Sequence, residues 1–222
     1  MKTQRILTWT LPLGLAGLLA ACGAEQPPPQ CTVGRGEHAV RFTLKSGSGV
    51  CAQKKAEIVG AQAFRVPGSG EPPTLALKPA FLLAGAEPAA SITSSGAFTT
   101  EYPVDNVCEV PSMSGARQVN AAGTALSYAW SGLRIQGQAA IPGTQWVGEL
   151  RYTEGDCTAT YEAVGVFPAI RCVRTENGAE VRDPAICKLA RAGSSLDPAF
   201  PIVCEESTNL CVLDGQPPAL RP

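Results

Sequence analysis

Apolar and polar residues alternate along much of the chain, which is the pattern of strands with one buried face. Between residues 38 and 45 every second position is apolar, at Val40, Phe42 and Leu44. The same period of two recurs in four later stretches, over 57–66, 74–78, 91–100 and 126–136. We therefore predict a strand in each of the five stretches.

Two hairpins are predicted where alternating stretches meet at a glycine. The longer hairpin spans residues 145–166, and Gly155 between its arms supplies the positive φ that a tight turn needs. The shorter hairpin is centred on Asn177-Gly178, the pair favoured in type I′ turns. It joins predicted strands over 171–175 and 179–182.

One stretch favours a helix. Asp183 can cap it and Pro184 suits its first turn, because a missing N–H costs nothing there. Good helix formers continue over 185–192 until Gly193 ends the pattern. Together with the short strands and frequent turns, this predicts a mostly β fold: a disulfide-stapled β-sandwich or open barrel with one short C-terminal helix.

The N-terminal stretch departs from the alternating pattern. Sixteen largely apolar residues, Ile6 to Ala21, follow Lys2 and Arg5 and end in small side chains. This layout is typical of a secretory signal peptide. A membrane-spanning helix is the alternative, but such a helix needs about 20 residues. The run is shorter, and no basic cluster follows it.

The end of the apolar run, Leu19, Ala20, Ala21 and Cys22, resembles the lipobox of bacterial lipoproteins. The resemblance covers only the first two dozen residues. It implies cleavage just before Cys22, which would then carry three acyl chains and anchor the protein firmly, since one chain alone binds a membrane only marginally. Gly23 stands where an aspartate retains family members in the inner membrane, so the resemblance implies the outer membrane. The alternative is a plain secreted protein in which Cys22 forms a disulfide.

The remaining cysteines form an even set of eight, which fits full pairing in an exported chain. The set comprises Cys31, Cys51, Cys108, Cys157, Cys172, Cys187, Cys204 and Cys211. Because short turn-rich segments join them, we favour a bridge from Cys31 to Cys51 and another from Cys204 to Cys211. Three of the eight precede Pro142-Gly143, so full oxidation needs a bridge between the two halves of the chain. Disulfides are favoured over a metal site, which prefers closer spacing.

The expected organisation has four parts. These are a lipoprotein signal peptide over 1–21, a lipidated N-terminus with a Pro-rich stalk over 22–30, a single disulfide-linked β-rich domain over 31–215 and a Pro-rich tail over 216–222. Three consecutive prolines in the stalk favour an extended polyproline II spacer. A terminus without any spacing role is the open alternative.

Composition excludes one class of function. The apolar fraction of 45% is normal for a packed protein. Once Lys2 and Arg5 are removed, 16 basic residues face 19 acidic ones, and the longest basic run is Lys54-Lys55. Nucleic-acid binding needs clusters of basic side chains, so we exclude it.

Candidate catalytic groups are few. His38 is the only histidine and hence the only imidazole base for a Ser–His or Cys–His mechanism, but no G-x-S-x-G motif accompanies it. We expect an exposed histidine at a strand edge. Paired carboxylates can cleave glycosidic bonds without histidine. The candidates, which alternation and turns place in solvent, are Glu149, Glu154, Asp156, Glu162, Glu205 and Glu206.

Large aromatic residues gather in the latter half of the chain. They either fill the core, which is the favoured interpretation, or grip a sugar or a peptide from one sheet face. They are Tyr128, Trp130, Trp146, Tyr152 and Tyr161. The stretch over 157–215, from CTATYEAVGVFPAIRC to CVLDG, loosely resembles the cysteine-rich outer-membrane lipoproteins of myxobacteria. That resemblance supports the location and implies no chemistry.

We therefore expect an outer-membrane lipoprotein, anchored through Cys22, that acts as a non-catalytic binding or structural component of the cell envelope. Its expected partner is an envelope protein or polysaccharide, and no cofactor or metal is expected. The alternative is a membrane-anchored envelope hydrolase of polysaccharide or ester that uses carboxylates or His38.

Overall fold

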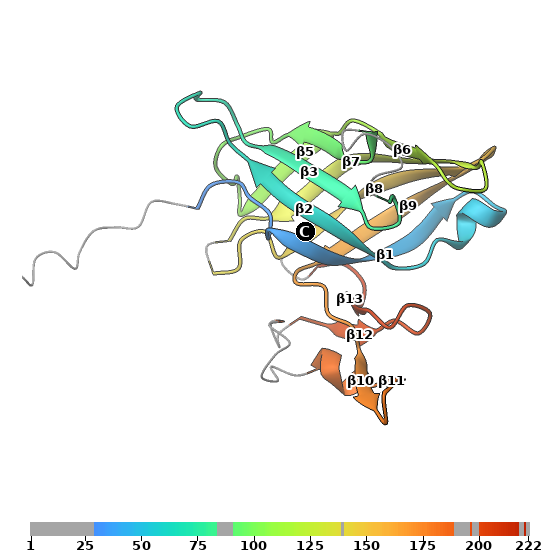
Figure 1. The fold of residues 1–222 in the computed structure, drawn as a ribbon. Helices are drawn as coiled ribbons and strands as arrows, with labels where there is room; N and C mark the ends of the chain where they lie inside the picture. The colour runs from blue at the N-terminus through green and yellow to red at the C-terminus, as the bar shows by residue number, and fades with distance from the viewer. Residues whose placement is uncertain are drawn as a thin grey trace, which may run out of the picture.

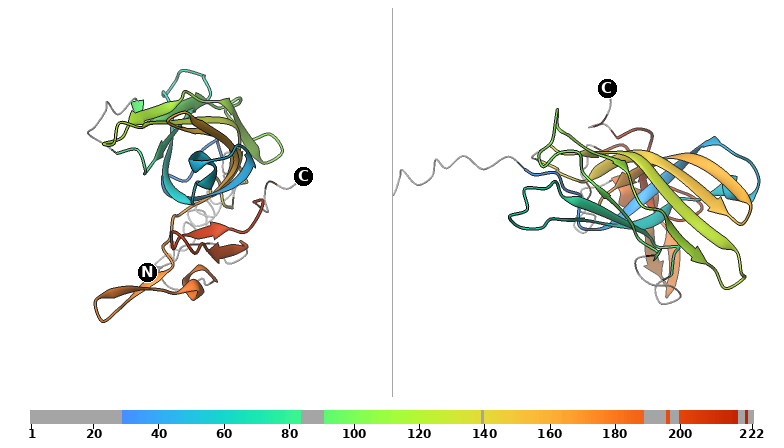
Figure 2. Two further views of the ribbon diagram at one scale, coloured as in Figure 1. Left: turned by 90° about the vertical axis from the view of Figure 1, so that its right-hand side faces the viewer. Right: turned by 90° about the horizontal axis from the view of Figure 1, so that it is seen from above.

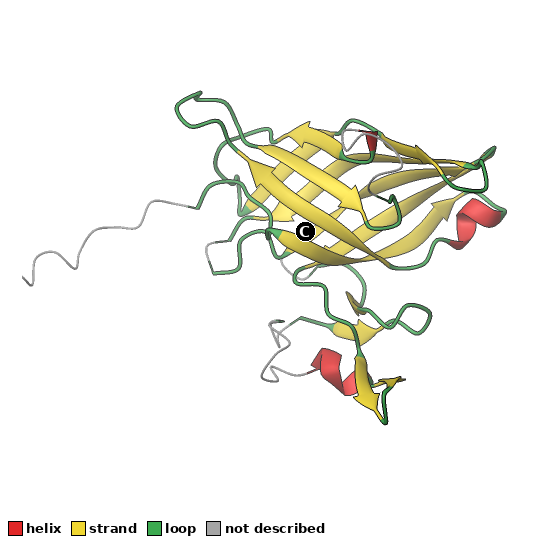
Figure 3. Ribbon diagram, viewed as in Figure 1, coloured by secondary structure: helices red, strands yellow, loops and turns green. Residues whose placement is uncertain are grey.

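The computed structural model describes residues 29–83, 91–138, 140–188, 196, 200–217 and 220. The predicted signal peptide and the lipobox, Leu19 to Cys22, lie outside the described residues, as do most of the stalk and part of the tail. Within the described part, the chain is mostly strand, and no helix reaches seven residues (Figure 3). No helix in that part is long and apolar enough to cross a membrane.

Nine antiparallel strands form one sheet that curls into a nearly closed barrel (Figures 1 and 2). The strands follow the order β4-β3-β2-β1-β9-β8-β7-β5, and β6 pairs with another part of β7. Their bounds are β1 Gly36–Ser46, β2 Glu57–Phe64, β3 Thr74–Pro79, β4 Ser94–Ala97, β5 Val107–Ser112, β6 Ala116–Val119, β7 Ala125–Gln136, β8 Gln145–Glu154 and β9 Cys157–Val166. The mostly β prediction is confirmed, and the sheet is a barrel.

The two edges of the sheet, β4 and β5, meet and close most of the gap. The amide of Ser114 donates to the carbonyl of Ser95 at 2.8 Å. A Cβ on Gly96 would lie 2.4 Å from the carbonyl oxygen of Ser112, so this approach requires glycine. Closure shields edges that would otherwise pair with other chains.

The alternating pattern located five of these strands. The stretches predicted at residues 38–45, 57–66, 74–78, 91–100 and 126–136 overlap β1, β2, β3, β4 and β7 respectively. Both hairpins are also confirmed. The arms of the first, β8 and β9, join at Gly155 with φ of 58°. The second joins β10 (Val173–Glu176) and β11 (Ala179–Arg182) through Asn177 and Gly178, both at positive φ.

The predicted C-terminal helix is wrong for the residues that are described. The chain forms only a 3₁₀ turn there, η4, over Pro184–Lys188, and the remainder of the predicted stretch lies outside the described residues (Figure 3). The expected cap is present, because Asp183 Oδ1 accepts from the amide of Ala185 at 3.1 Å. Short helices propagate poorly, and Cys187 is fixed by a disulfide to Cys211 instead.

Large aromatic side chains fill the barrel, which confirms their favoured interpretation as core residues. Tyr128, Trp130, Trp146, Tyr152 and Tyr161 are all buried. Trp130 and Trp146 meet edge to face, with ring centroids 5.9 Å apart. Edge-to-face pairs of this kind add about 0.5–1.5 kcal/mol beyond the burial of their area.

A small C-terminal lobe packs on the outside of the barrel. It contains β10, β11, η4, β12 (Ile202–Cys204) and β13 (Cys211–Leu213), and it lies below the barrel in Figure 1. A second buried apolar cluster joins Leu213 of the lobe to Ala39 and Val164 of β1 and β9. Arg41 of β1 also pairs with Asp214 at 3.0 Å.

All eight cysteines of the predicted set form disulfides. The bridges are Cys31–Cys108, Cys51–Cys157, Cys172–Cys204 and Cys187–Cys211. The second of these joins the parts of the chain on either side of Pro142-Gly143, as the odd cysteine counts required.

The two favoured pairings are wrong. Cys31 precedes β1 and Cys51 follows it, so an eleven-residue strand carries them to opposite ends of the barrel. Cys204 and Cys211 do lie opposite each other on β12 and β13, but their sulfurs bond to two other cysteines. Separation along the chain was therefore a poor guide to pairing.

Candidate functional site

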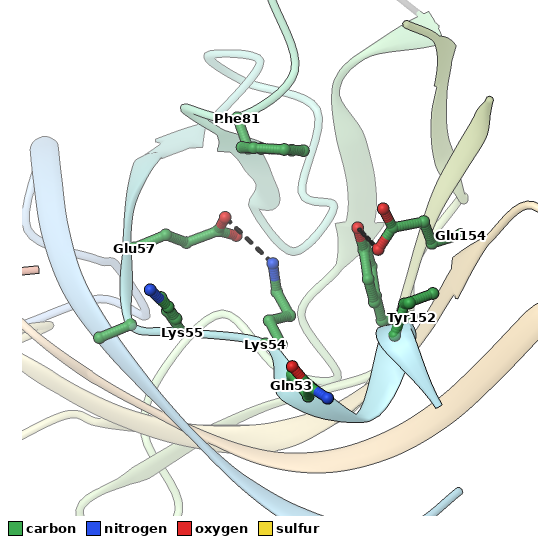
Figure 4. Close-up of a pocket in the computed structure, with 9 residues that line it drawn as sticks. Gln53, Lys54, Lys55, Glu57, Phe81, Tyr152 and Glu154 are labelled. Carbon is green, nitrogen blue, oxygen red and sulfur yellow. Dashed lines mark hydrogen bonds and ion pairs between the residues drawn. The ribbon is translucent and has the colours of Figure 1, made fainter. Parts of the chain in front are cut away.

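A pocket of about 320 Å³ lies at the end of the barrel where β1 ends and β2 begins (Figure 4). Its volume is at the lower end of the range for small-molecule sites, which is about 300–1,000 Å³. The lining combines apolar side chains with a few charged ones. It consists of Val50, Gln53, Lys54, Lys55, Ala56, Glu57, Phe81, Tyr152 and Glu154.

The connection between β1 and β2 builds one wall of this pocket. It contains a short 3₁₀ helix, η2 (Val50–Gln53), which the Cys51–Cys157 disulfide ties to the start of β9. The hydroxyl of Tyr161, inside the barrel, donates to the carbonyl of Cys51 at 2.5 Å. The amide of Lys54 donates to the same hydroxyl at 3.1 Å. The connection is thus held across the barrel end, with Lys54 directed inward.

Lys54 is buried in a ring of compensating groups, and its side chain is only 6% exposed. Its Nζ donates to Tyr128 Oη at 2.8 Å and to Glu57 Oε2 at 3.1 Å. The ammonium also lies 4.5 Å from the ring centroids of Tyr128 and Tyr152 and 4.8 Å from that of Phe42. Aromatic faces attract cations, so the rings stabilise a charge that burial alone would disfavour.

Burial shifts the acid–base equilibria of this cluster toward neutral forms. Loss of solvation lowers the pKa of Lys54 and raises the pKa of Glu57, while their mutual attraction opposes both shifts. Burial and the nearby carboxylates also raise the pKa of Tyr128 and of Tyr152. Both hydroxyls therefore remain protonated, and they donate to Glu57 Oε2 at 3.1 Å and to Glu154 Oε2 at 3.2 Å respectively.

One acceptor in the pocket wall is unsatisfied. Glu57 Oε2 accepts hydrogen bonds from both Lys54 and Tyr128, but Oε1 has no hydrogen-bond partner among the described residues. This oxygen exposes less than 1 Å². Buried polar atoms are nearly always paired, so Oε1 is an acceptor that a donor of a bound molecule could satisfy.

His38 lies far from this pocket, near the start of β1, and the expectation of an exposed histidine is wrong. Its ring is buried against Trp146 and Phe167. Its Nδ1 accepts from the indole Nε1 of Trp146 at 3.1 Å, so Nε2 carries the proton and donates to the carbonyl of Gly34 at 2.8 Å. Both ring nitrogens are used, so the imidazole is not poised to act as a base.

The structure brings Glu149 and Glu162 opposite each other on β8 and β9 but does not gather the six candidate carboxylates at one site. Glu154 alone among them lines the pocket. Glu149 pairs with Lys45 at 2.6 Å on the barrel exterior, and Glu206 lies in the C-terminal lobe. The remainder are Asp156 in the exposed β8–β9 turn, Glu162 on β9 and Glu205 beside Glu206.

No sequence pattern singles out the lysine and the carboxylate at the centre of the pocket. In the sequence, Lys54 and Lys55 form only a short basic run, and Glu57 is only the first residue of a predicted strand. A lysine followed three residues later by a glutamate, at the start of a strand, was the available signal. It is common in surface loops and therefore weak.

Three sulfurs in the lobe lie close enough to suggest a metal site. The Sγ atoms of Cys172, Cys187 and Cys204 are within 4.8 Å of one another. All three belong to disulfides, and a metal ligand must be a thiolate. The cluster is therefore two neighbouring bridges that fix the lobe.

Comparison with known proteins places the barrel in a family. The sequence profile of the MlpA family matches residues 36–168, which is more than half of the chain. The chain belongs to the MlpA family. The matched residues run from the start of β1 to just beyond β9, so the MlpA profile covers the whole barrel and ends before the C-terminal lobe.

A curated MlpA relative matches over the full length. It is named "Putative lipoprotein MlpA", comes from Myxococcus xanthus, and is 29% identical over 243 residues that cover 99% of this chain and all of the relative. A search of solved structures finds no significant match. The family and the relative confirm the resemblance to myxobacterial lipoproteins.

Proposed function

We propose that this member of the MlpA family is an outer-membrane lipoprotein, anchored through acyl chains on Cys22, whose barrel is a non-catalytic binding component of the cell envelope. The lipobox residues Leu19 to Cys22 support the anchor. The full-length similarity to a protein named as a lipoprotein supports it independently.

The position of the pocket relative to the start of the described chain carries the proposal. The chain reaches the barrel at the start of β1, where the amide of Cys31 donates to the carbonyl of Glu101 at 2.8 Å and its sulfur bonds to Cys108. The pocket lies beyond the other end of β1, whose eleven residues span roughly 35 Å at about 3.3 Å per residue. An anchor on Cys22 would therefore direct the pocket away from the membrane.

The chemistry of the pocket favours binding over catalysis. None of its nine lining residues is a serine, cysteine or histidine. Nucleophilic catalysis needs a nucleophile within hydrogen-bond reach of a base. Lys54 already donates to two partners, and the hydroxyl of Tyr152 is engaged with Glu154. We propose an envelope protein or polysaccharide as the partner.

One observation favours the hydrolase as a second candidate. Glu57 and Glu154 line the same pocket, and burial raises the pKa of Glu57, as it does for general acids of glycosidases. The ion pair with Lys54 argues against that role, because it favours Glu57 as a carboxylate, which has no proton to donate.

Two measurements, one on the native protein and one on a variant, test the anchor. The intact mass of protein extracted from membranes should correspond to a chain that begins at Cys22 and carries three acyl chains, and a Cys22→Ser variant should leave the membrane fraction. An unmodified thiol or an uncut leader would overturn the anchor.

Crosslinking in intact cells tests the direction of the pocket. A photoreactive residue at Val50, 65% exposed at the pocket rim, should capture an envelope component. The control places the photoreactive residue at Val104, which is 60% exposed at the opposite end of the barrel, and it should not capture that component. Turnover of an envelope polymer by pure protein, abolished by Glu154→Gln, would instead establish the hydrolase.

A further inference from the structure

The unsatisfied oxygen of Glu57 specifies part of what the pocket binds. Oε1 lies in the pocket wall and lacks a donor among the described residues, whereas Oε2 has two. Leaving a buried acceptor unpaired costs about 1–3 kcal/mol, and more when the group is charged. A ligand that brings an O–H or N–H to Oε1 removes that cost.

The charges around the pocket disfavour an ionic ligand. Two lysines, Lys54 and Lys55, balance two glutamates, Glu57 and Glu154, within the lining. The ammonium of Lys54 is held by Glu57 and by aromatic rings, so it offers little to an anion. A cation would meet two nearby lysines, and an anion would meet Glu154. The balance favours a neutral ligand that carries hydrogen-bond donors.

The apolar lining adds a second requirement. Phe81 and Tyr152 face into the pocket (Figure 4), and Val50 also lines it. Phe81 is 57% exposed, so one side of its ring is open to a ligand. Because Oε1 exposes less than 1 Å², a donor of the ligand reaches it only after a neighbouring side chain moves.

We propose that this pocket binds a neutral saccharide ring. Ring hydroxyls donate to Glu57 Oε1 and to the carboxylate of Glu154, and the C–H face of the ring packs on Phe81 and Tyr152. A saccharide combines neutral donors with an apolar face, and one or two rings suit a site of about 320 Å³. The inference rests on the proposed function, because it names the ligand class of the same pocket.

The test compares rings of one size and three charges. Glucose and N-acetylglucosamine are neutral, glucosamine is a cation and glucuronate is an anion. Each is titrated into the full-length lipoprotein in micelles of a detergent without sugar groups, and binding is followed by saturation-transfer NMR. We expect saturable binding of a neutral ring and at least fivefold weaker binding of both charged ones. No saturable binding of either neutral ring, or equal affinity for a charged one, would overturn the proposal.

Variants assign the binding to this pocket. Phe81→Ala should weaken binding of the neutral ring at least tenfold without affecting folding, because the side chain is exposed. Phe64→Ala is the matched control, since Phe64 is 50% exposed and lies near the opposite end of the barrel. Glu57→Gln should also weaken binding of the neutral ring, because it replaces a carboxylate acceptor with a neutral amide. An unchanged affinity in Phe81→Ala would show that the sugar binds outside this pocket. If the photoreactive residue at position 50 captures an envelope protein in cells while no sugar binds, the proposed binding function is supported and the saccharide proposal is rejected.

Discussion

Trp146 donates a hydrogen bond from its indole Nε1 to Nδ1 of the buried His38, at 3.1 Å. The same imidazole donates from Nε2 to the carbonyl of Gly34, at 2.8 Å. The two contacts together fix one neutral tautomer, which satisfies the indole N–H inside the barrel. They also link β8, the start of β1 and the chain segment before it. The only histidine of the sequence is thus a structural group.

The stability of the protein should fall as the pH drops through the titration of His38. Burial lowers the pKa of His38 from its ordinary value of 6.5 to about 4. Between these values the unfolded chain binds a proton that the folded chain does not, so the contribution is complete above pH 6.5 and is lost toward pH 4. Between pH 7 and pH 5 this group alone should cost about 2 kcal/mol of unfolding free energy.

Urea unfolding of the wild type and of His38→Gln measures this contribution of His38 to the unfolding free energy. Glutamine can also accept from Trp146 and donate to Gly34, and it does not titrate. The difference in unfolding free energy between the two proteins should therefore shrink by about 2 kcal/mol from pH 7 to pH 5. A constant difference across that range would show that the pKa of His38 is the same in the folded and unfolded chains.

A methyl group at Gly165 should disrupt the same contact. A Cβ built on Gly165 of β9 would lie 2.1 Å from Cε2 of Trp146, so the indole must move and its bond to His38 must break. Overpacking of this kind costs about 1–3 kcal/mol, and the lost hydrogen bond adds to it. We expect Gly165→Ala to lower the unfolding free energy by about 3 kcal/mol.

Gly60→Ala is the control for that substitution. Gly60 also lies within a strand, but its added Cβ would meet nothing closer than the carbonyl oxygen of Lys78, at 3.6 Å. It should change the unfolding free energy by less than about 1 kcal/mol. If both variants unfold at the same urea concentration, the close approach of Gly165 to Trp146 does not determine stability.

The fold could be predicted from the sequence where side chains alternate between core and solvent. β1, β2 and β7 were located in this way, and the two hairpins by their turn glycines. β5 was missed because Pro111 interrupts its pattern, which an edge strand of the sheet tolerates. β6 was missed because its buried positions are Ala116 and Gln118 while the apolar Val119 is exposed, so polarity does not follow burial.

The candidate site could not be predicted because no local pattern encodes it. In the sequence, Lys54 and its neighbour form a basic pair that is typical of solvent-exposed loops. Lys54 is buried only because the η2 segment folds over the end of the barrel, which places it beside Phe42, Tyr128 and Tyr152. These rings come from three other strands. The pairing of Cys31 with Cys51 was wrong for the same reason, since β1 separates two cysteines that are neighbours along the chain.

Replacing Lys54 alone should destabilise the barrel strongly. Lys54→Met would leave the buried carboxylate of Glu57 without its cation, and breaking a buried pair from one side costs about 3–5 kcal/mol. Adding Glu57→Leu should recover at least half of that loss, because apolar replacements of both partners are often neutral. The recovery of unfolding free energy should be incomplete, because the buried hydroxyl of Tyr128 loses its hydrogen bonds to both Lys54 and Glu57.

A double-mutant cycle in urea measures this coupling, and pH provides the check. The pKa of Glu57 is raised by burial, so the carboxyl in Lys54→Met can take up a proton as the pH falls, and the penalty of that variant should shrink below neutral pH. Additive effects of the two substitutions, with no dependence on pH, would mean that the pair is not coupled in the folded protein.

The Cys51–Cys157 disulfide should stabilise the protein more than Cys187–Cys211 does. Its two cysteines are 106 residues apart along the chain, against 24 for the bridge in the lobe. The chain-entropy relation gives about 1 kcal/mol more for the longer loop. We therefore expect the double Cys→Ala variant at 51 and 157 to lose about 1 kcal/mol more unfolding free energy in urea than the variant at 187 and 211.

Because Cys51 also holds η2 over the pocket, the variant at 51 and 157 should lose affinity for the pocket ligand, whereas the variant at 187 and 211 should retain it. Equal affinity in both variants would show that the pocket wall is held by Tyr161 and Lys54 without the bridge.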